Sequence, residues 1–187
     1  MPSANRLIIL AGPSAAGKTT LIQAIRRGHI PAPCKQVLGD ITEAFEYRSI
    51  RELIAEDQPF PSQMLLHYDF LHQYCPTRGF RHIGEVCRHY QSTSAVTLQV
   101  SADVLAKRLS NRFKKTLGSM LYRPAPHRLR RLISMRGRLA IYRNPGRLAR
   151  LYSEWTLFVS KCGIREHVIL DPTDEAGDIQ AVTAEAQ

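Results

Sequence analysis

The residues best suited to chemistry form a glycine-bounded loop near the N-terminus of the 187-residue chain. From Gly12 to Thr19 the sequence fits the pattern GxxxxGK[ST], whose glycines let the backbone turn its N–H groups toward phosphate oxygens. In this pattern Lys18 would reach the β- and γ-phosphates of a nucleoside triphosphate, and the Thr19 hydroxyl would bind Mg²⁺. The sequence therefore predicts a loop for ATP and Mg²⁺, made by Gly12, Pro13, Ser14, Ala15, Ala16, Gly17, Lys18, Thr19 and Thr20.

The elements on both sides of this loop are those that phosphate binding needs. The apolar run Arg6–Ala11 predicts a buried strand, and Thr19–Arg27 predicts a helix that ends at Gly28. A loop between a strand and a helix directs its N–H groups and the positive end of the helix dipole toward a bound anion. Two other interpretations stay open: a turn that only joins strand to helix, and a loop that binds nucleotide without turnover.

Two carboxylates follow apolar runs and are candidates for contact with the metal and the acceptor. Asp69 closes the run Ser62–Phe70, which is typical of a central strand that brings a carboxylate to the edge of a sheet. We expect Asp69 to lie near Thr19, to hold Mg²⁺ through water and to support catalysis. Asp40 follows a possible short strand, Gln36–Leu38, and is the candidate that positions or deprotonates an acceptor hydroxyl. The alternative for each residue is an aspartate that forms a turn.

The net charge of +10 is concentrated in one segment. Val104–Ser153 holds fourteen Lys or Arg and no acid, so these like charges should face something anionic. Guanidinium groups suit phosphate because they stay charged and bind it with two parallel hydrogen bonds. The candidates for nucleotide binding are Arg108 and Arg112, and those for catalysis are Arg123, Arg128 and Arg131. A polyanionic substrate or nucleic acid is the alternative target of the segment, although few aromatic residues lie between its arginines.

The rest of the sequence alternates short apolar runs with helical patterns, which favours an α/β fold. Further strands are predicted at Ala95–Val100 and His167–Leu170, and further helices at Thr42–Ile54, Arg81–Tyr90, Ser101–Phe113, Arg128–Tyr142 and Arg147–Cys162. Prolines interrupt the basic segment, which is consistent with a mobile flap. We expect a single domain over residues 1–187, a three-layer sandwich with a mainly parallel sheet flanked by helices and an Arg-rich helical lid at about 113–142.

Several classes of protein are disfavoured by what the sequence lacks. No apolar run approaches the ~18–20 residues that span a bilayer, and none is typical of a signal peptide, so we expect a cytoplasmic protein without a membrane partner. The four cysteines lie far apart without a CxxC pair, which predicts free thiols. Cysteines and histidines cluster between His67 and His89, but without the usual zinc-finger spacing, so we interpret them as structural.

Three stretches resemble one family of enzymes. LIILAGPSAAGKTTL, at Leu7–Leu21, resembles the opening of guanylate kinases and, more broadly, of P-loop kinases related to the nucleoside-monophosphate kinases. AVTLQV at Ala95–Val100, with the arginine-bearing helix after it, and HVILD at His167–Asp171 are similar to later elements of the same group. The resemblance implies a P-loop fold, ATP as donor, a lid of arginines and an acidic residue on the metal. Residues Pro31–Cys34 do not match the Arg- and Pro-rich guanine site of guanylate kinases, so GMP is not the expected acceptor.

Together these features predict ATP- and Mg²⁺-dependent phosphoryl transfer to a small acceptor that carries a hydroxyl or a phosphate. Two alternatives come from other classes: a nucleotide-regulated P-loop protein that binds nucleic acid or another polyanion, and a P-loop sulfotransferase-like enzyme. The intact Gly17-Lys18-Thr19 sequence counts against the sulfotransferase, whose loop usually lacks it. Nucleic acid is a possible partner but not the favoured one.

Overall fold

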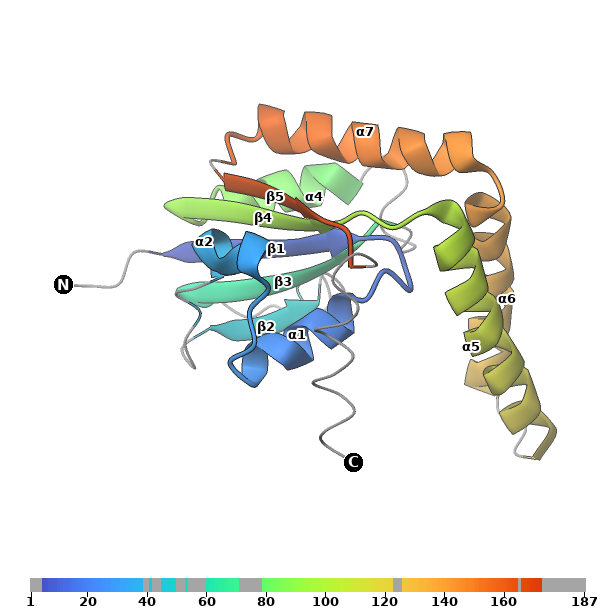
Figure 1. Ribbon diagram of the computed structural model, residues 1–187. Helices are drawn as coiled ribbons and strands as arrows, with labels where there is room; N and C mark the ends of the chain where they lie inside the picture. Colours follow the sequence, from blue (N-terminus) through green and yellow to red (C-terminus); the bar gives the residue numbers. More distant parts are fainter. Residues whose placement is uncertain are drawn as a thin grey trace. The chain divides into compact units, whose positions relative to one another are not determined.

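The structure, a computed structural model, describes residues 5–38, 41, 45–49, 53, 60–70, 79–122, 126–164 and 166–172. Its elements are β1 (Arg6–Gly12), α1 (Lys18–Arg26), a 3₁₀ turn (Ala32–Cys34), α2 (Lys35–Leu38), β2 (Glu46–Ser49), β3 (Gln63–Asp69), α4 (Gly79–Cys87), β4 (Ser92–Leu98), α5 (Ala102–Tyr122), α6 (Pro126–Tyr142), α7 (Pro145–Lys161) and β5 (Glu166–Leu170) (Figure 1).

The chain divides into two compact units, which we describe separately. The sheet unit comprises Met1–Gln99 and Trp155–Gln187, and the hairpin unit comprises Val100–Glu154. Helix α7 belongs to both units, because its residues before Trp155 lie in the hairpin unit and the rest in the sheet unit.

The sheet unit is built on five parallel strands in the order β2-β3-β1-β4-β5. Strand β1 lies in the centre, and its residues from Leu7 to Ala11 are fully buried because neighbouring strands cover both edges and helices cover both faces. The predicted α/β class, with a parallel sheet flanked by helices, is confirmed.

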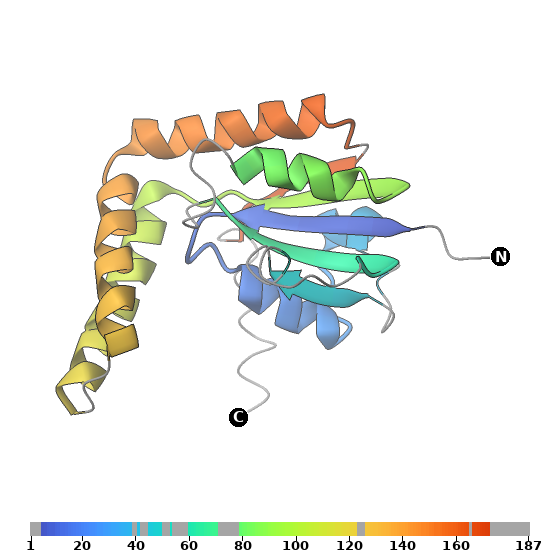
Figure 2. The same ribbon diagram turned by 180° about the vertical axis from the view of Figure 1, so that it is seen from behind.

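Helices cover the two faces of this sheet as separate layers (Figures 1 and 2). On one face lie α1 and α2, and the Arg26 guanidinium of α1 lies over the Tyr47 ring of β2, 5.4 Å from its centre. On the other face lie α4 and the end of α7, where the fully buried Trp155 packs on Tyr68 of β3 with ring centres 5.2 Å apart. Trp155 therefore belongs to the core of the sheet unit.

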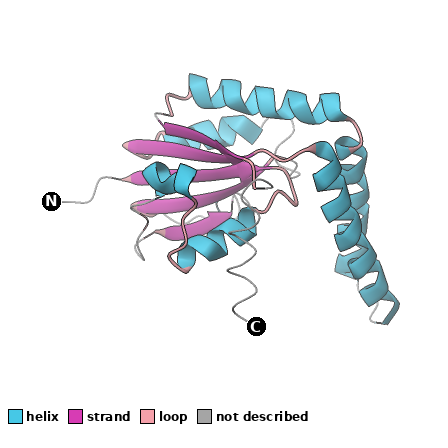
Figure 3. Cartoon of the chain, viewed as in Figure 1, coloured by secondary structure: helices cyan, strands magenta, loops and turns pink. Residues whose placement is uncertain are grey.

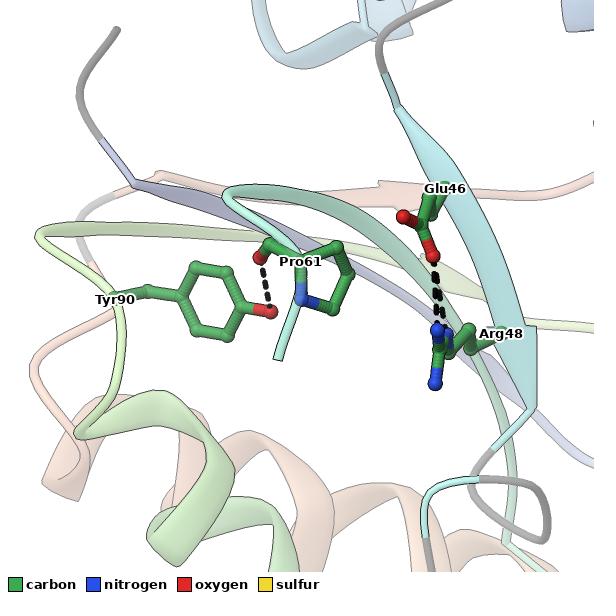
Figure 4. Close-up of polar contacts among 4 residues, drawn as sticks. All are labelled: Glu46, Arg48, Pro61 and Tyr90. Carbon is green, nitrogen blue, oxygen red and sulfur yellow. Dashed lines mark hydrogen bonds and ion pairs between the residues drawn. The ribbon is translucent and has the colours of Figure 1, made fainter. Parts of the chain in front are cut away.

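At the amino ends of the strands, polar side chains tie the chain entering β3 to the chain entering β4 (Figure 4). The Tyr90 hydroxyl donates to the Pro61 carbonyl at 2.9 Å, and Arg48 pairs with Glu46 on β2 at 3.0 Å. Burial raises the pKa of Tyr90 to about 12, with Arg48 opposing the rise and Glu46 adding to it. Tyr90 therefore stays a hydrogen-bond donor at neutral pH.

In the hairpin unit, α5 and α6 lie side by side and run in opposite directions (Figure 3). Their buried residues include Leu105 and Leu109 on α5 and Leu132 and Met135 on α6, at the spacings that place side chains on one helix face. The Tyr152 hydroxyl accepts the N–H of Val100 at 3.0 Å, which ties the end of this unit to its beginning.

Three predicted elements differ from the structure. Gln36–Leu38 is helical rather than a strand, and Glu46–Ser49 is a strand inside the range predicted as the helix Thr42–Ile54. The residues of β2 are half-buried or exposed, so their pairing with β3, rather than their own propensity, decides the strand. Helix α5 continues past Phe113 to Tyr122, because no proline interrupts it before residue 124.

Candidate functional site

The loop from Gly12 to Lys18 joins the central strand to α1 through several unusual backbone conformations. Gly12 has φ +151°, and a Cβ atom there would lie 3.0 Å from the Leu98 carbonyl oxygen of β4. Gly17 has φ +105°, and Ala15 has φ +68°, which is left-handed and unfavourable for alanine. Glycine adopts such angles without strain, so Ala15 is the strained residue of the three, and strain of this kind is often found where a backbone holds a ligand.

The ammonium group of Lys18 is held inside this loop. Its Nζ donates to the carbonyl oxygens of Gly12 and Pro13, both at 2.7 Å, and the side chain is only 4% exposed. A buried ammonium must be matched by strong acceptors, since desolvation of an unpaired charge costs several kcal/mol. Lys18 therefore holds its ammonium group against the backbone of the loop, at the position where the sequence pattern predicts phosphate oxygens.

Asp69 lies beside the loop at the end of β3. Its Cα pairs in register with Gly12, and its Oδ2 accepts the hydroxyl of the buried Ser14. The next residue, Phe70, donates its N–H to the Gly12 carbonyl at 3.2 Å. The structure thus brings the predicted carboxylate to the predicted loop, and it adds the Ser14 contact, which the sequence did not indicate.

The amino end of α1 follows directly from the same loop. Gly17 precedes the helix and has no side chain to cap it, and the first turn contains no acidic residue. The first N–H groups and the helix dipole are therefore suited to an anion. Leu21, Ile22 and Ile25 are buried and fix α1 against the sheet, whereas Thr19 and Thr20 are exposed.

The other predicted site residues are placed as follows. Asp40 and Arg123 lie outside the described residues, and Arg128 lies on α6 with its side chain outside them. The remaining predicted arginines belong to the hairpin unit: Arg108 is half-buried on α5, Arg112 is exposed on α5 and Arg131 is exposed on α6. Their roles toward a nucleotide therefore stay predictions from the sequence.

A second polar group lies in the core near the end of β4. The Trp155 indole donates to the Thr97 hydroxyl oxygen at 2.7 Å, and this oxygen lies 2.8 Å from Nε2 of His167 on β5. The Thr97 hydroxyl can donate to Nε2 or accept from it, depending on which ring nitrogen of His167 carries the proton. Burial lowers the pKa of His167, which favours the neutral ring. The three residues are far apart in sequence, and no local pattern indicated the group.

The cysteines of the described chain are free thiols, as predicted: Cys34, Cys87 and Cys162. Burial raises the pKa of Cys87 to about 12, with a further rise from the neighbouring Cys162, so this thiol is not a nucleophile at neutral pH. Within the described ranges no three His, Cys, Asp or Glu side chains gather as a metal site.

Comparison with known proteins adds no relative: no protein-family model matches the sequence, and the search of curated proteins found no match. Among the described helices none is long and apolar enough to cross a membrane.

Proposed function

We propose that the protein binds ATP with Mg²⁺ at the loop from Gly12 to Thr19 and transfers the terminal phosphoryl group to a small acceptor bearing a hydroxyl or a phosphate. One observation carries this proposal. The ammonium of Lys18 is buried in the loop between β1 and α1, where it donates to the Gly12 and Pro13 carbonyl oxygens, at the amino end of a helix that no side chain caps.

Each group at the loop has a part in the proposed reaction. The N–H groups at the start of α1 would bind phosphate oxygens, and Lys18 would exchange its carbonyl partners for β- and γ-phosphate oxygens. Mg²⁺ is a hard ion that prefers oxygen ligands, so the Thr19 hydroxyl and the Asp69 carboxylate fit it. When bound, it would neutralise charge on the phosphates during transfer.

The topology of the sheet supports a ligand at this place. The chain leads from β1 through α1 to β2 at one edge of the sheet, whereas it leads from β4 to β5 at the opposite edge. In open parallel sheets, ligands bind beyond the carboxyl ends of strands where the connections diverge in this way. The loop follows β1, and its first residue lies against Leu98 at the end of β4.

Further residues enter the proposal from the sequence. Arg108 and Arg112 would bind nucleotide, and Arg123, Arg128 and Arg131 would stabilise charge on the transferred group. Asp40 would orient or deprotonate the acceptor. The free thiols fit the reducing environment of a cytoplasm, where we expect the reaction to take place.

Calorimetric titration with ATP and Mg²⁺ tests the proposal. The native chain should bind, and Lys18→Ala should lower the affinity by roughly 100-fold or more, because it removes charge-assisted hydrogen bonds of roughly 1.5–3 kcal/mol each. The matched control is Lys35→Ala, since Lys35 is an exposed lysine of the sheet unit and should leave binding unchanged. An unchanged ATP affinity in Lys18→Ala would refute the proposal.

The acceptor can then be sought by thermal shift. A panel of hydroxyl- and phosphate-bearing compounds, each added with ATP and Mg²⁺, should raise the unfolding temperature only for compounds that bind the native state. Formation of ADP that depends on the same compound would identify it as the acceptor.

A further inference from the structure

The hairpin unit exposes aliphatic side chains near the tip of its two helices. Leu129 and Ile133 on α6 are 51% and 65% exposed, and Leu117 on α5 is 42% exposed. Leu129 and Ile133 are four residues apart, so they lie on one face of α6. Residues on another face of the helix, Leu132 and Met135, are buried. The exposed pair is therefore surplus to the core that holds the hairpin together.

Basic side chains surround these aliphatic residues. Arg130 and Arg136 lie one turn before and one turn after Ile133, and both are exposed. Lys114 and Lys115 are exposed within one turn of Leu117 on α5. Since the sequence from 104 to 153 contains no acid, this surface carries positive charge without internal compensation.

Three kinds of occupant can be compared by their chemistry. A second copy of the chain would bring the same positive charges to the surface and would be repelled. Nucleic acid would satisfy the charges, but single strands are held by stacking on aromatic rings. Among the aromatic side chains of this unit that the structure describes, Phe113 and Tyr152 are half-buried and Tyr142 is 1% exposed, while the exposed large apolar side chains are aliphatic. A bilayer of anionic lipids attracts the bases with its headgroups and accepts aliphatic side chains below them.

We propose that the tip of the hairpin unit, marked by Leu117, Leu129 and Ile133, binds the surface of anionic lipid membranes. The unit would lie on the bilayer with its aliphatic side chains at the headgroup boundary, and no part of it would span the membrane. The expectation of no membrane partner rested on the missing spanning segment and not on side-chain exposure, which only the structure gives. This binding goes beyond the proposed phosphoryl transfer and does not depend on it.

Co-sedimentation of the full chain with vesicles, without nucleotide, tests the proposal. Vesicles of phosphatidylcholine mixed with phosphatidylserine should bind the protein, and vesicles of phosphatidylcholine alone should not. The double variant Leu129→Ser/Ile133→Ser should lower partitioning about tenfold or more. The double variant Arg130→Gln/Arg136→Gln should lower it on the order of 30-fold, from about fivefold for each lost base.

The sheet unit supplies a matched control. Leu157 and Ile169 are also an exposed leucine and an exposed isoleucine, at 56% and 51%, so Leu157→Ser/Ile169→Ser makes the same chemical change elsewhere. This control should bind vesicles as the native chain does, and far-UV circular dichroism should show all variants folded.

The possible results separate membrane binding from the alternatives. Loss of binding in the Leu129/Ile133 variant, with binding kept in the control, supports the proposal. Absence of binding to the anionic vesicles overturns it. Binding that falls in the Arg130/Arg136 variant but persists in the Leu129/Ile133 variant also overturns it and, if single-stranded oligonucleotides bind with the same pattern, assigns the surface to nucleic acid. ATP titration of the same samples reports independently on the proposed function.

Discussion

Neutralising Asp69 should change the Mg²⁺ dependence of ATP binding and little else. In Asp69→Asn the side-chain oxygen can still accept the Ser14 hydroxyl, so the loop keeps its contact with β3. A hydrogen bond to a charged group contributes roughly 1.5–3 kcal/mol and a neutral one roughly 0.5–1.5 kcal/mol, so the free energy of unfolding should fall by about 1 kcal/mol.

The effect on ATP affinity should have opposite signs with and without the metal. Without Mg²⁺ the carboxylate repels the triphosphate, so Asp69→Asn should bind ATP more tightly; with Mg²⁺ the variant lacks a metal ligand and should bind it less tightly. Two unit charges about 4 Å apart interact by roughly 1 kcal/mol in water and roughly 4 kcal/mol near a protein surface. Because Asp69 is half-buried, we expect about 1–3 kcal/mol, or about 5- to 150-fold in the ratio of the two dissociation constants.

Titration of ATP in Mg²⁺ and in EDTA measures this ratio directly. Glu166→Gln is the matched control, because Glu166 is also a carboxylate that accepts a serine hydroxyl, from Ser94 at 3.2 Å. Ser94 pairs with Ile8, four residues before Gly12 and roughly 13 Å along the strand. The control should leave the ratio unchanged. An Asp69→Asn protein whose affinities change equally in both buffers would refute the metal role and leave Asp69 as a residue that only positions Ser14.

Three further predictions concern the structure around the loop. Gly12→Ala should lower the free energy of unfolding by roughly 1–3 kcal/mol in a urea titration and should weaken ATP binding, because its Cβ atom would meet a backbone carbonyl of β4. The control Gly118→Ala, at an open helical position, should neither lower the free energy of unfolding nor weaken ATP binding. Thr97→Val should lower the free energy of unfolding by roughly 1–3 kcal/mol, and the unfolding temperature by roughly 2–12 °C, because the Trp155 indole loses the Thr97 hydroxyl as an acceptor. Equal melting curves of the variant and the native chain by circular dichroism would contradict a stabilising role of this hydrogen bond. Burial lowers the pKa of His167 below 6.5, so the unfolded chain binds more protons than the folded chain, and the free energy of unfolding should fall as the pH drops from above 6.5 through the folded pKa. Urea titrations of His167→Gln across this pH range should show no such fall. If the variant keeps the same pH dependence, other groups cause it.

The sequence predicted the parts of the fold that local signals determine. The strand, loop and helix from Arg6 to Arg26 are contiguous, and each carries its own pattern, so all three were placed within one or two residues. Asp69 was placed at a strand end by the apolar run before it, and the structure brings it to the loop. The strand β2 was missed because its four residues, EYRS, have no clear alternation and become a strand by pairing with β3.

The contacts that complete the site join residues far apart in the chain. The Ser14 hydroxyl reaches a carboxylate 55 residues away, and the Thr97 hydroxyl joins side chains 58 and 70 residues away. Such pairs are set by strand order and register, which a reading of local patterns does not supply. The exposure of Leu129 and Ile133 could not be predicted from the sequence either, because the sequence shows their spacing but not which face of α6 the hairpin buries.

The hydrogen bonds of the Gly12 carbonyl oxygen connect the loop to the fluorescence of Trp155. It accepts both the Lys18 ammonium at 2.7 Å and the N–H of Phe70 at 3.2 Å, and the Phe70 ring lies 5.5 Å from the ring of Trp155. A ligand that draws Lys18 away from this oxygen removes one of the two hydrogen bonds that the oxygen accepts. The other hydrogen bond comes from Phe70, whose ring packs on Trp155. Because Trp155 is the only tryptophan of the chain, the protein carries a built-in fluorescent probe of its own loop, whose emission should change when a triphosphate binds.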